Sequence, residues 1–127
     1  MRITIFHNVA TGGAGRHVGF DGYQPGQPLV PVFAYDVEPL DGSIEELQVI
    51  AELAFEAFNA DPELLTGRQR DLATRYRGRL LRSLSVGDVV RAGLIPLACD
   101  SAGFRVVPAD LNEVRVTQHG TRPFEGS

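Results

Sequence analysis

Lysine and tryptophan are absent from this chain of 127 residues, cysteine occurs once, and no run of hydrophobic residues is long. Because Cys99 stands alone, the chain can form neither an internal disulfide nor a zinc site built from cysteines. No apolar run approaches the ~20 residues that span a bilayer, and the N-terminus meets polar residues too soon for a signal peptide. These absences predict a cytoplasmic protein that is not inserted in a membrane.

The charges that are present are unevenly distributed. All 12 basic residues are arginine, and 16 acidic residues give a net charge of −4. Nine acidic residues and no basic one fall between Asp36 and Glu63, whereas six arginines fall between Arg68 and Arg82 against the single Asp71. Opposed blocks in one small domain usually neutralise each other, although either could face a partner.

The hydrophobic pattern predicts a single α+β domain over residues 1–118, followed by a loose tail over residues 119–127. Six segments have the composition of strands: residues 2–9, 30–37, 89–91, 94–99, 104–107 and 113–118. The short turns after Asp88 favour an antiparallel meander. Pro31 cannot donate a ladder hydrogen bond, which predicts that its strand lies at an edge of the sheet or begins after it.

An amphipathic helix is expected over residues 43–60. Ser43 is a typical N-cap, and Glu46 completes a capping box. Apolar residues at helical spacing form the face that we expect to be buried: Leu47, Ile50, Ala51, Ala54 and Phe58. Residues 68–82 could form a second helix through Leu72, Tyr76 and Leu80, although Gly78 weakens that prediction. The expected architecture is an antiparallel sheet of about five or six strands, curled toward a barrel as one variant, with helix 43–60 across one face.

A run of nine residues, Arg-Ser-Leu-Ser-Val-Gly-Asp-Val-Val at positions 82–90, marks the change from helical to strand patterning. Ser85 to Asp88 fits a type II turn, which requires a positive φ at Gly87. One interpretation is that Ser83, Ser85 and Asp88 form a polar edge that binds a partner. The other is a turn that leads into a central strand.

A long loop is predicted over residues 10–27, which are rich in glycine. Long ordered loops often bind something, and this one offers four polar candidates: Arg16, His17, Asp21 and Tyr23. Its glycines from Gly13 to Gly19 approach the spacing of a dinucleotide fingerprint, but no helix can form across residues 20–26. We therefore expect no nucleotide cofactor.

Two further interpretations concern nucleic acid and catalysis. Aromatic and basic residues are interleaved as in single-strand binders at Arg68, Arg70, Arg75, Tyr76, Arg77, Arg79 and Arg82. The competing expectation is that these arginines pair with the acidic helix. His7, His17 and His119 have no spacing typical of metal ligands, so no metal site is predicted. An enzyme would require the loop to bring His7, His17 and Asp88 together.

Several stretches carry a family resemblance: residues 8–10, 15–17, 22–26, 55–59, 76–77 and 82–90. They resemble small uncharacterised proteins of actinobacteria, which often sit on plasmids and integrated elements. The Ser-Leu-Ser-Val-Gly-Asp-Val-Val core alone is also similar to the YodL-like domains of bacterial mobile elements. Longer relatives carry a Gly-Trp pair where this chain has Gly103-Phe104. The resemblance implies an accessory protein of a mobile or accessory genetic region, and no particular chemistry.

From these observations we expect a non-enzymatic interaction protein. The predicted binding surface is the loop of residues 10–27 together with the polar edge of residues 83–90. The expected partner is a protein, and binding of RNA or single-stranded DNA through residues 68–82 is the first alternative.

Overall fold

The computed structural model describes residues 1–10 and 22–114. Its elements are, in chain order, β1 (Arg2–Asn8), β2 (Pro28–Asp36), α1 (Ile44–Asn59), the 3-10 turn η1 (Pro62–Leu64), α2 (Gly67–Gly78), β3 (Val89–Ala92), β4 (Ile95–Asp100), β5 (Gly103–Val106) and β6 (Asn112–Glu113). The strands form one sheet in the order β5-β4-β3-β1-β2-β6. Neighbours are antiparallel except β2 and β6, which are parallel.

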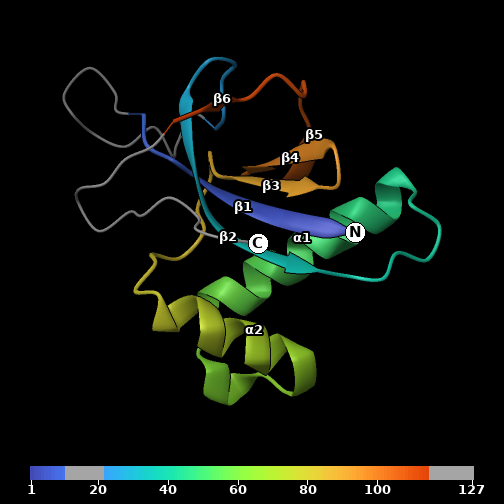
Figure 1. Ribbon diagram of the computed structural model, residues 1–127, viewed down its shortest axis with the longest axis vertical. Coiled ribbons are helices and arrows are strands. Elements are labelled where there is room, and N and C mark those ends of the chain that lie inside the picture. Colours follow the sequence, from blue (N-terminus) through green and yellow to red (C-terminus); the bar gives the residue numbers. More distant parts are fainter. Residues whose placement is uncertain (11–21, 115–127) are drawn as a thin grey trace.

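The predicted α+β architecture with one main helix is confirmed, but the barrel variant is wrong. β5 and β6 lie at opposite ends of the sheet, and within the described residues they do not pair with each other. Figure 1 shows α1 and α2 on the same side of this open sheet. The meander of β3, β4 and β5 is as predicted. Of the last predicted strand, 113–118, the structure describes only the start, and residues 115–118 lie outside the described ranges.

β1 is the central strand and is buried on both faces. Ile3, Ile5 and His7 point toward the helices, and each has no exposed surface. Phe6 points to the opposite face, where it packs in a second cluster that includes Tyr23. β1 supplies Ile3 and Ile5 to one cluster and Phe6 to the other, which suits a strand that is covered on both sides.

The prediction made from Pro31 holds only locally, because β2 begins at Pro28, before that proline, and β6 lies outside it in the sheet. The pairing register with β1 shifts between Ile5 and Phe6, so β2 bulges at Val32, next to the proline. β6 pairs only with the first two residues of β2. At Pro31, β1 is therefore the one paired neighbour of β2 among the described strands, which is the edge position that a proline tolerates.

The N-terminus of α1 is capped, but not by a full capping box. The backbone amide of Glu46 donates to Oγ of Ser43 at 3.1 Å, as expected. The carboxylate of Glu46 does not return to the amide of Ser43. It accepts hydrogen bonds from the amides of Leu40, Asp41 and Gly42, at 2.6, 3.1 and 2.7 Å. The loop before the helix folds over the carboxylate, and the amide of Ser43 is satisfied by Oδ1 of Asp41 instead.

The predicted inner face of α1 is buried except at one position. Leu47, Ala51, Ala54 and Phe58 lie in the core. Ile50 is only partly buried and packs at the margin. The ring of Phe58 stacks on Tyr76 of α2, with centroids 4.2 Å apart, and meets Phe33 of β2 edge-on. These three rings join both helices to the sheet.

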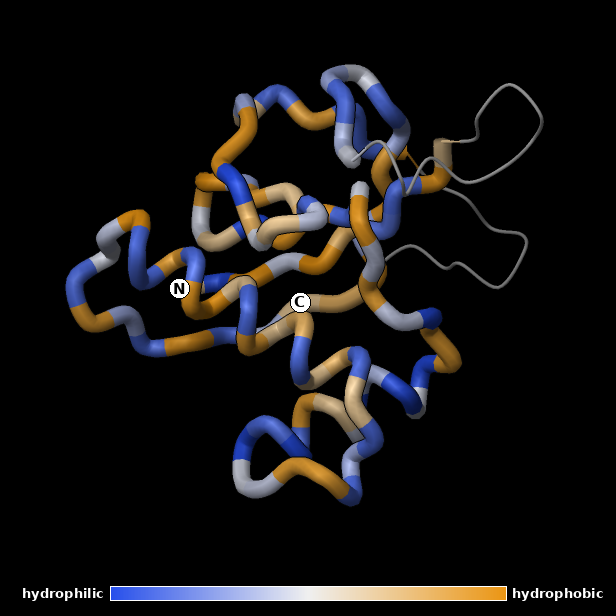
Figure 2. Tube along the Cα trace, turned by 180° about the vertical axis from the view of Figure 1, so that it is seen from behind, coloured by the Kyte–Doolittle hydropathy of each residue, from blue (hydrophilic) through white to orange (hydrophobic). Residues whose placement is uncertain are grey.

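The second helix ends earlier than its apolar spacing suggested. α2 stops at Gly78, and Leu80, which was expected on its inner face, is 81% exposed with a φ of 59°. Figure 2 shows that orange, hydrophobic segments follow the strands, whereas much of α2 is blue. Neither α1 nor α2 has the length and apolar character needed to cross a bilayer, a statement limited to the part of the chain that the structure describes.

Candidate functional site

The carboxylate of Asp88 is the centre of the 82–90 motif and is 1% exposed. Its Oδ1 accepts from the amide of Asn8 at 2.8 Å and from Nη2 of Arg82 at 2.8 Å. Its Oδ2 accepts from the amide of Ser85 at 2.9 Å and from Nη1 of Arg82 at 2.7 Å. Bidentate pairs of this kind are strong and directional. Asp88 therefore ties the end of β1 to its own segment, residues 82–90.

The predicted turn at this position is confirmed. Gly87 has a φ of 99°, and the amide of Asp88 donates to the carbonyl of Ser85 at 3.0 Å. Ser83 is exposed and Ser85 is half-buried, with its Oγ 3.5 Å from Oδ2 of Asp88. Of the three residues proposed to form a polar binding edge, the two serines thus lie near the surface and Asp88 lies inside the protein.

Asn8 extends this arrangement to both ends of the 10–27 loop. Its Nδ2 donates to Oε1 of Gln27 at 2.8 Å and to the carbonyl of Gly87 at 3.0 Å. Its Oδ1 accepts from the amide of Ala10 at 2.9 Å. We call Asn8, Gln27, Arg82, Gly87 and Asp88 the anchor network. The loop therefore leaves β1 and enters β2 at one hydrogen-bonded cluster.

The four loop residues singled out from the sequence divide into two groups. Arg16, His17 and Asp21 lie outside the described residues. Tyr23 is buried at 2% exposure, in the cluster around Phe6. Burial raises the pKa of its hydroxyl, and its carbonyl accepts from Nη2 of Arg105 at 2.7 Å. Tyr23 is a core residue that helps to fix the end of the loop.

His7 is fully buried beside Tyr76. Its Nε2 lies 2.7 Å from the hydroxyl of Tyr76, which itself donates to the carbonyl of Arg82 at 2.7 Å. A tyrosine hydroxyl has one proton, so Nε2 of His7 is the donor in this pair. Burial, with the negative charge of Asp88, raises the pKa of Tyr76 above its usual range. His7 thus bonds to α2, and Asp88 is occupied by Arg82.

The nucleic-acid alternative requires Tyr76 as an exposed stacking platform, but Tyr76 has no exposed surface. Leu72 and Tyr76 are four residues apart and face the core together, as their helical spacing indicates. Sequence reasoning noted that spacing and yet also placed Tyr76 on a binding surface. A base cannot stack on a ring that lies within the core.

The arginines of residues 68–82 do not pair with the acidic helix, and that expectation is wrong. Among the described residues, none of the ion pairs joins them to a glutamate of α1. The side chain of α2 that reaches Glu56 is Gln69, at 3.2 Å. Arg77 donates instead to the carbonyl of Ala60 at 2.8 Å, and Arg68 donates to the carbonyl of Asp36. These two arginines thus donate to backbone carbonyls at the ends of α1 and β2 rather than to glutamates. At the C-terminus of a helix the unpaired carbonyls carry partial negative charge, which suits a cation.

Arg70, Arg75 and Arg79 complete the set. Arg70 and Arg75 are exposed and Arg79 is half-buried. The guanidinium of Arg75 lies 5.5 Å from the ring centroid of Phe33, within the range of a cation–π contact. Burial alone would lower the pKa of Arg82, but its bonds to Asp88 and the charge of that carboxylate raise it.

Cys99 borders a cavity of about 240 Å³ between α1 and the β4–β5 turn, with Phe55 and Phe104. Burial raises the pKa of its thiol to about 11, and the charges of Asp88 and Asp100 act in the same direction. A thiol that stays protonated at neutral pH is a poor nucleophile. Within residues 1–10 and 22–114, no three histidine, cysteine or acidic side chains are grouped as metal ligands would be.

Comparison of the chain with protein-family models, with curated proteins and with solved structures finds no match. The site is therefore defined by its own geometry: an α+β domain in which a buried aspartate, paired with a partly exposed arginine, helps to fix the base of a long loop. The resemblance to actinobacterial and YodL-like proteins stays a prediction.

Proposed function

We propose that the protein is a non-catalytic interaction module that binds a partner protein through the loop of residues 10–27 and the adjoining edge of residues 83–90. The anchor network is the observation that supports this proposal. The two ends of the long loop bond to the side chain of Asn8, and the backbone amide of Asn8 donates to the buried carboxylate of Asp88. A loop held in this way has the design of a recognition loop on a rigid scaffold. An accessory role in a mobile or accessory genetic region, in the cytoplasm of an actinobacterium, rests on the resemblance alone.

The test is affinity capture with the full chain as bait in an actinobacterial lysate, followed by quantitative mass spectrometry. We expect a partner that the parent enriches and that the double variant Arg16→Ala with His17→Ala loses. The matched control is Arg70→Ala with Asp71→Ala, two exposed positions on α2. A partner that the loop variant retains at the parental level would remove the loop from the proposal.

Binding of RNA or single-stranded DNA is the second candidate. It is favoured by one observation, that the glutamates of α1 do not neutralise the arginines of α2 among the described residues. Four phosphate contacts would give a slope of about −3 in log K against log salt, which fluorescence anisotropy can measure. We expect association weaker than about 10⁻⁴ M at physiological salt, because Tyr76 is buried and Arg82 is engaged by Asp88.

The enzymatic alternative has less support from the geometry. His7 is bonded to Tyr76, and the four hydrogen bonds described above occupy both oxygens of Asp88. A general base must reach the proton that it removes, and a carboxylate held in this way is turned from any substrate.

A further inference from the structure

The cavity between α1 and the β4–β5 turn has the features of a second binding site. It measures about 240 Å³, and its walls come from α1 and from residues 99–104, all within the described part of the chain. Sites for drug-sized ligands measure roughly 300–1,000 Å³, so this cavity suits one small group. None of its lining residues belongs to the loop of residues 10–27 or to residues 82–90, so an inference from this cavity does not rest on the function proposed above.

Two aromatic rings line this cavity, one from the helix and one from the sheet. Phe55 of α1 and Phe104 of β5 meet edge-on, with ring centroids 6.3 Å apart, and both are only partly buried. Gly103 contributes no side chain, and a Cβ added there would meet no atom within 4 Å beyond its chain neighbours. The space beside Gly103 is therefore open. Aromatic rings that border such a space attract cations, because the faces of the rings are negative.

A hydrogen bond holds α1 against β5 at this cavity. Nε2 of Gln48 donates to the carbonyl of Phe104 at 3.3 Å. Gln48 lies one helical turn before Glu52, which also lines the cavity, so the bond fixes this side of α1 relative to the strand. The walls are thus held in place before any ligand arrives. A preorganised site loses less conformational freedom on binding.

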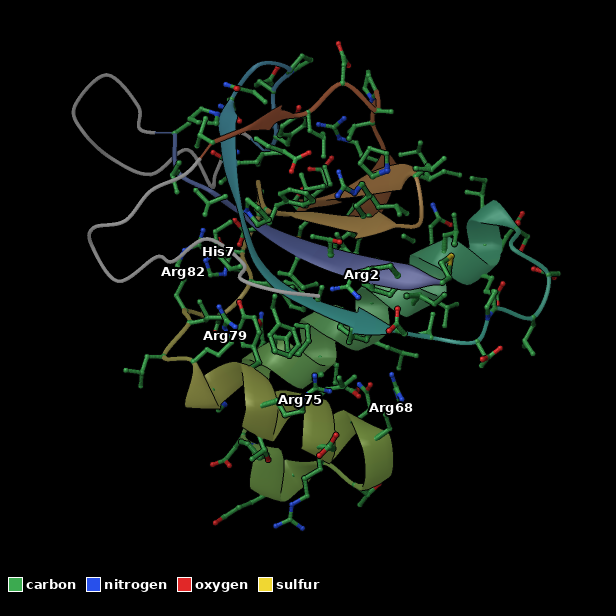
Figure 3. All side chains as sticks on the ribbon, in the orientation of Figure 1. Arg2, His7, Arg68, Arg75, Arg79 and Arg82 are labelled. Carbon is green, nitrogen blue, oxygen red and sulfur yellow. The ribbon has the colours of Figure 1, made fainter. Side chains whose placement is uncertain are left out.

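Glu52 gives this cavity a negative charge. It is exposed, and among the described residues no arginine pairs with its carboxylate. α1 carries four glutamates and no basic residue, and Figure 3 shows that the arginines labelled on and beside α2 lie away from β4 and β5. Arg105 is nearer, but it follows Phe104 in the strand and therefore points to the opposite face, where its Nε lies 3.1 Å from Oδ2 of Asp100. The charge of Glu52 is thus available to a ligand.

Cys99 forms a buried wall of the cavity and is 4% exposed. It pairs with Phe104 in the sheet, so both side chains lie on the face that α1 covers. Burial is the main reason why the pKa of its thiol is raised to about 11, and the charges of Asp88 and Asp100 act in the same direction. The sulfur is therefore uncharged at neutral pH, and these carboxylates give a negative potential beside it. A negative potential favours a cation over an anion.

We propose that this cavity binds an alkylammonium group, carried by a small metabolite or by a lysine side chain of a partner protein. The ammonium group lies against the rings of Phe55 and Phe104, and Glu52 supplies its counter-charge. The alkyl part covers the thiol of Cys99 and leaves water. A metal ion would require more oxygen ligands than Glu52 offers, and an anion would be repelled by it.

The test is an NMR titration of the nitrogen-15-labelled full chain with choline, a small and soluble alkylammonium compound. The matched ligand is 3,3-dimethylbutanol, which has carbon in place of the charged nitrogen and keeps the shape. We expect choline to shift the amides of Gly103 and Phe104 with a Kd of about 1 mM, since so small a ligand has few atoms to offset its loss of freedom. We expect the alcohol to bind about fivefold more weakly or less, because it lacks the charge.

Variants of the walls separate the contribution of the charge from that of the rings. We expect Glu52→Gln to weaken choline binding about fivefold and Phe104→Leu about threefold, since the first removes the counter-charge and the second an aromatic face. Glu63→Gln is the control, because Glu63 is exposed in η1, does not line the cavity and changes the net charge equally. We expect it to change binding less than about twofold. Thermal melts and the amide spectrum establish that each variant is folded.

Cys99 allows a second measurement, because it is the only cysteine of the chain and lines the cavity. At alkaline pH its thiolate attacks methyl methanethiosulfonate, forms a disulfide with the methylthio group and releases methanesulfinate. Choline at about ten times its Kd should slow this reaction about tenfold, because the reagent reaches only the unoccupied fraction. The alcohol at the same concentration should slow it about threefold or less.

The lysine model N-acetyl-lysine-N-methylamide distinguishes the two sources of the group. Tighter binding of this compound than of choline assigns the cavity to a side chain of a partner protein, and the reverse order assigns it to a free metabolite. Four results would overturn the inference. They are the absence of shifts at Gly103 and Phe104 with choline at about fifty times the expected Kd, equal binding by the alcohol, binding unaffected by both Glu52→Gln and Phe104→Leu, and an unchanged rate of Cys99 modification.

Discussion

Asp88 is a charged residue inside the protein, and its surroundings account for that position. A carboxylate taken out of water is costly unless hydrogen bonds and a counter-charge replace its hydration. Here two backbone amides and one guanidinium supply both. Arg82 remains 37% exposed on its side chain, so the pair is only partly desolvated. The desolvation cost of Arg82 is therefore smaller than that of a fully buried charge. The pair also joins β1 to the segment that leads into β3.

Asp88→Asn should lower the free energy of unfolding by about 2–4 kcal/mol, because one oxygen becomes an amide that faces donors. Urea denaturation at neutral pH measures this change. Asp71→Asn is the control, since Asp71 is exposed on α2 and should shift stability by less than about 0.5 kcal/mol. If both variants are equally stable, the anchor network does not hold the fold together.

Gly87→Val should cost about 1–3 kcal/mol, because a β-branched residue is strained at a φ of 99°. Gly78→Ala is the matched comparison. Gly78 ends α2, has no positive φ, and an added Cβ would meet no atom within 4 Å. We expect that change to be neutral or to stabilise by up to about 1 kcal/mol. Thermal melts of both variants decide the matter, and an unchanged melting temperature for Gly87→Val would contradict the strain argument.

At the scale of elements, local sequence patterns predicted α1 and the meander. The features that those patterns did not predict depend on contacts between residues that are far apart in the sequence. Ser43 and Gly87 each act within a few residues, so their roles could be predicted from the sequence. Asn8 contacts Asp88 across 80 positions of the chain. No spacing in one sequence indicates that pair, and Asp88 was therefore assigned to a surface. Gln69 rather than an arginine packs against α1 because of how α2 is rotated about its own axis. The sequence of a short, mostly polar helix does not determine that rotation.

The N-terminus of α1 should lose stability at acid pH through Glu46. Hydrogen bonds from the amides of Leu40 and Gly42, the largest causes, lower the pKa of this carboxyl. A lowered folded-state pKa gives stability that is present above the unfolded value of about 4.3 and is lost as the pH falls through the folded value. Glu46→Gln should therefore flatten the acid side of the stability–pH profile. Glu45→Gln, at an exposed neighbour, should leave the profile unchanged, and equal profiles for parent and Glu46→Gln would refute the assignment.

At the scale of the whole molecule, the sheet order places β1 in the middle and both helices on one side (Figure 1). Residues 2–9 were predicted to form a strand, but nothing in the sequence specified that the neighbours of β1 are β2 and β3. α2 stands farther from this centre and keeps most of its surface in water, although Tyr76 binds it to the core. Stability should consequently be uneven across the domain.

Amide hydrogen exchange should show this unevenness. The amides of Ile3 and Ile5 should exchange only through global unfolding, since β1 is paired on both sides and buried on both faces. Exposed positions of α2, such as Thr74, should exchange faster through local opening. NMR-detected exchange with added denaturant separates the two classes. Identical exchange free energies in β1 and α2 would mean that the domain opens as one unit.

The pairing of β1 with β3 also constrains when the protein can fold. β1 is synthesised first, yet one of its two neighbours ends at Ala92. Until that segment leaves the ribosome, one side of the central strand has no partner, and the carboxylate of Asp88 has not yet been synthesised. A sheet whose centre closes through contacts of such long sequence separation folds late and slowly relative to its size. During synthesis, the nascent chain therefore exposes to cellular chaperones an unpaired strand edge that β3 covers in the folded protein.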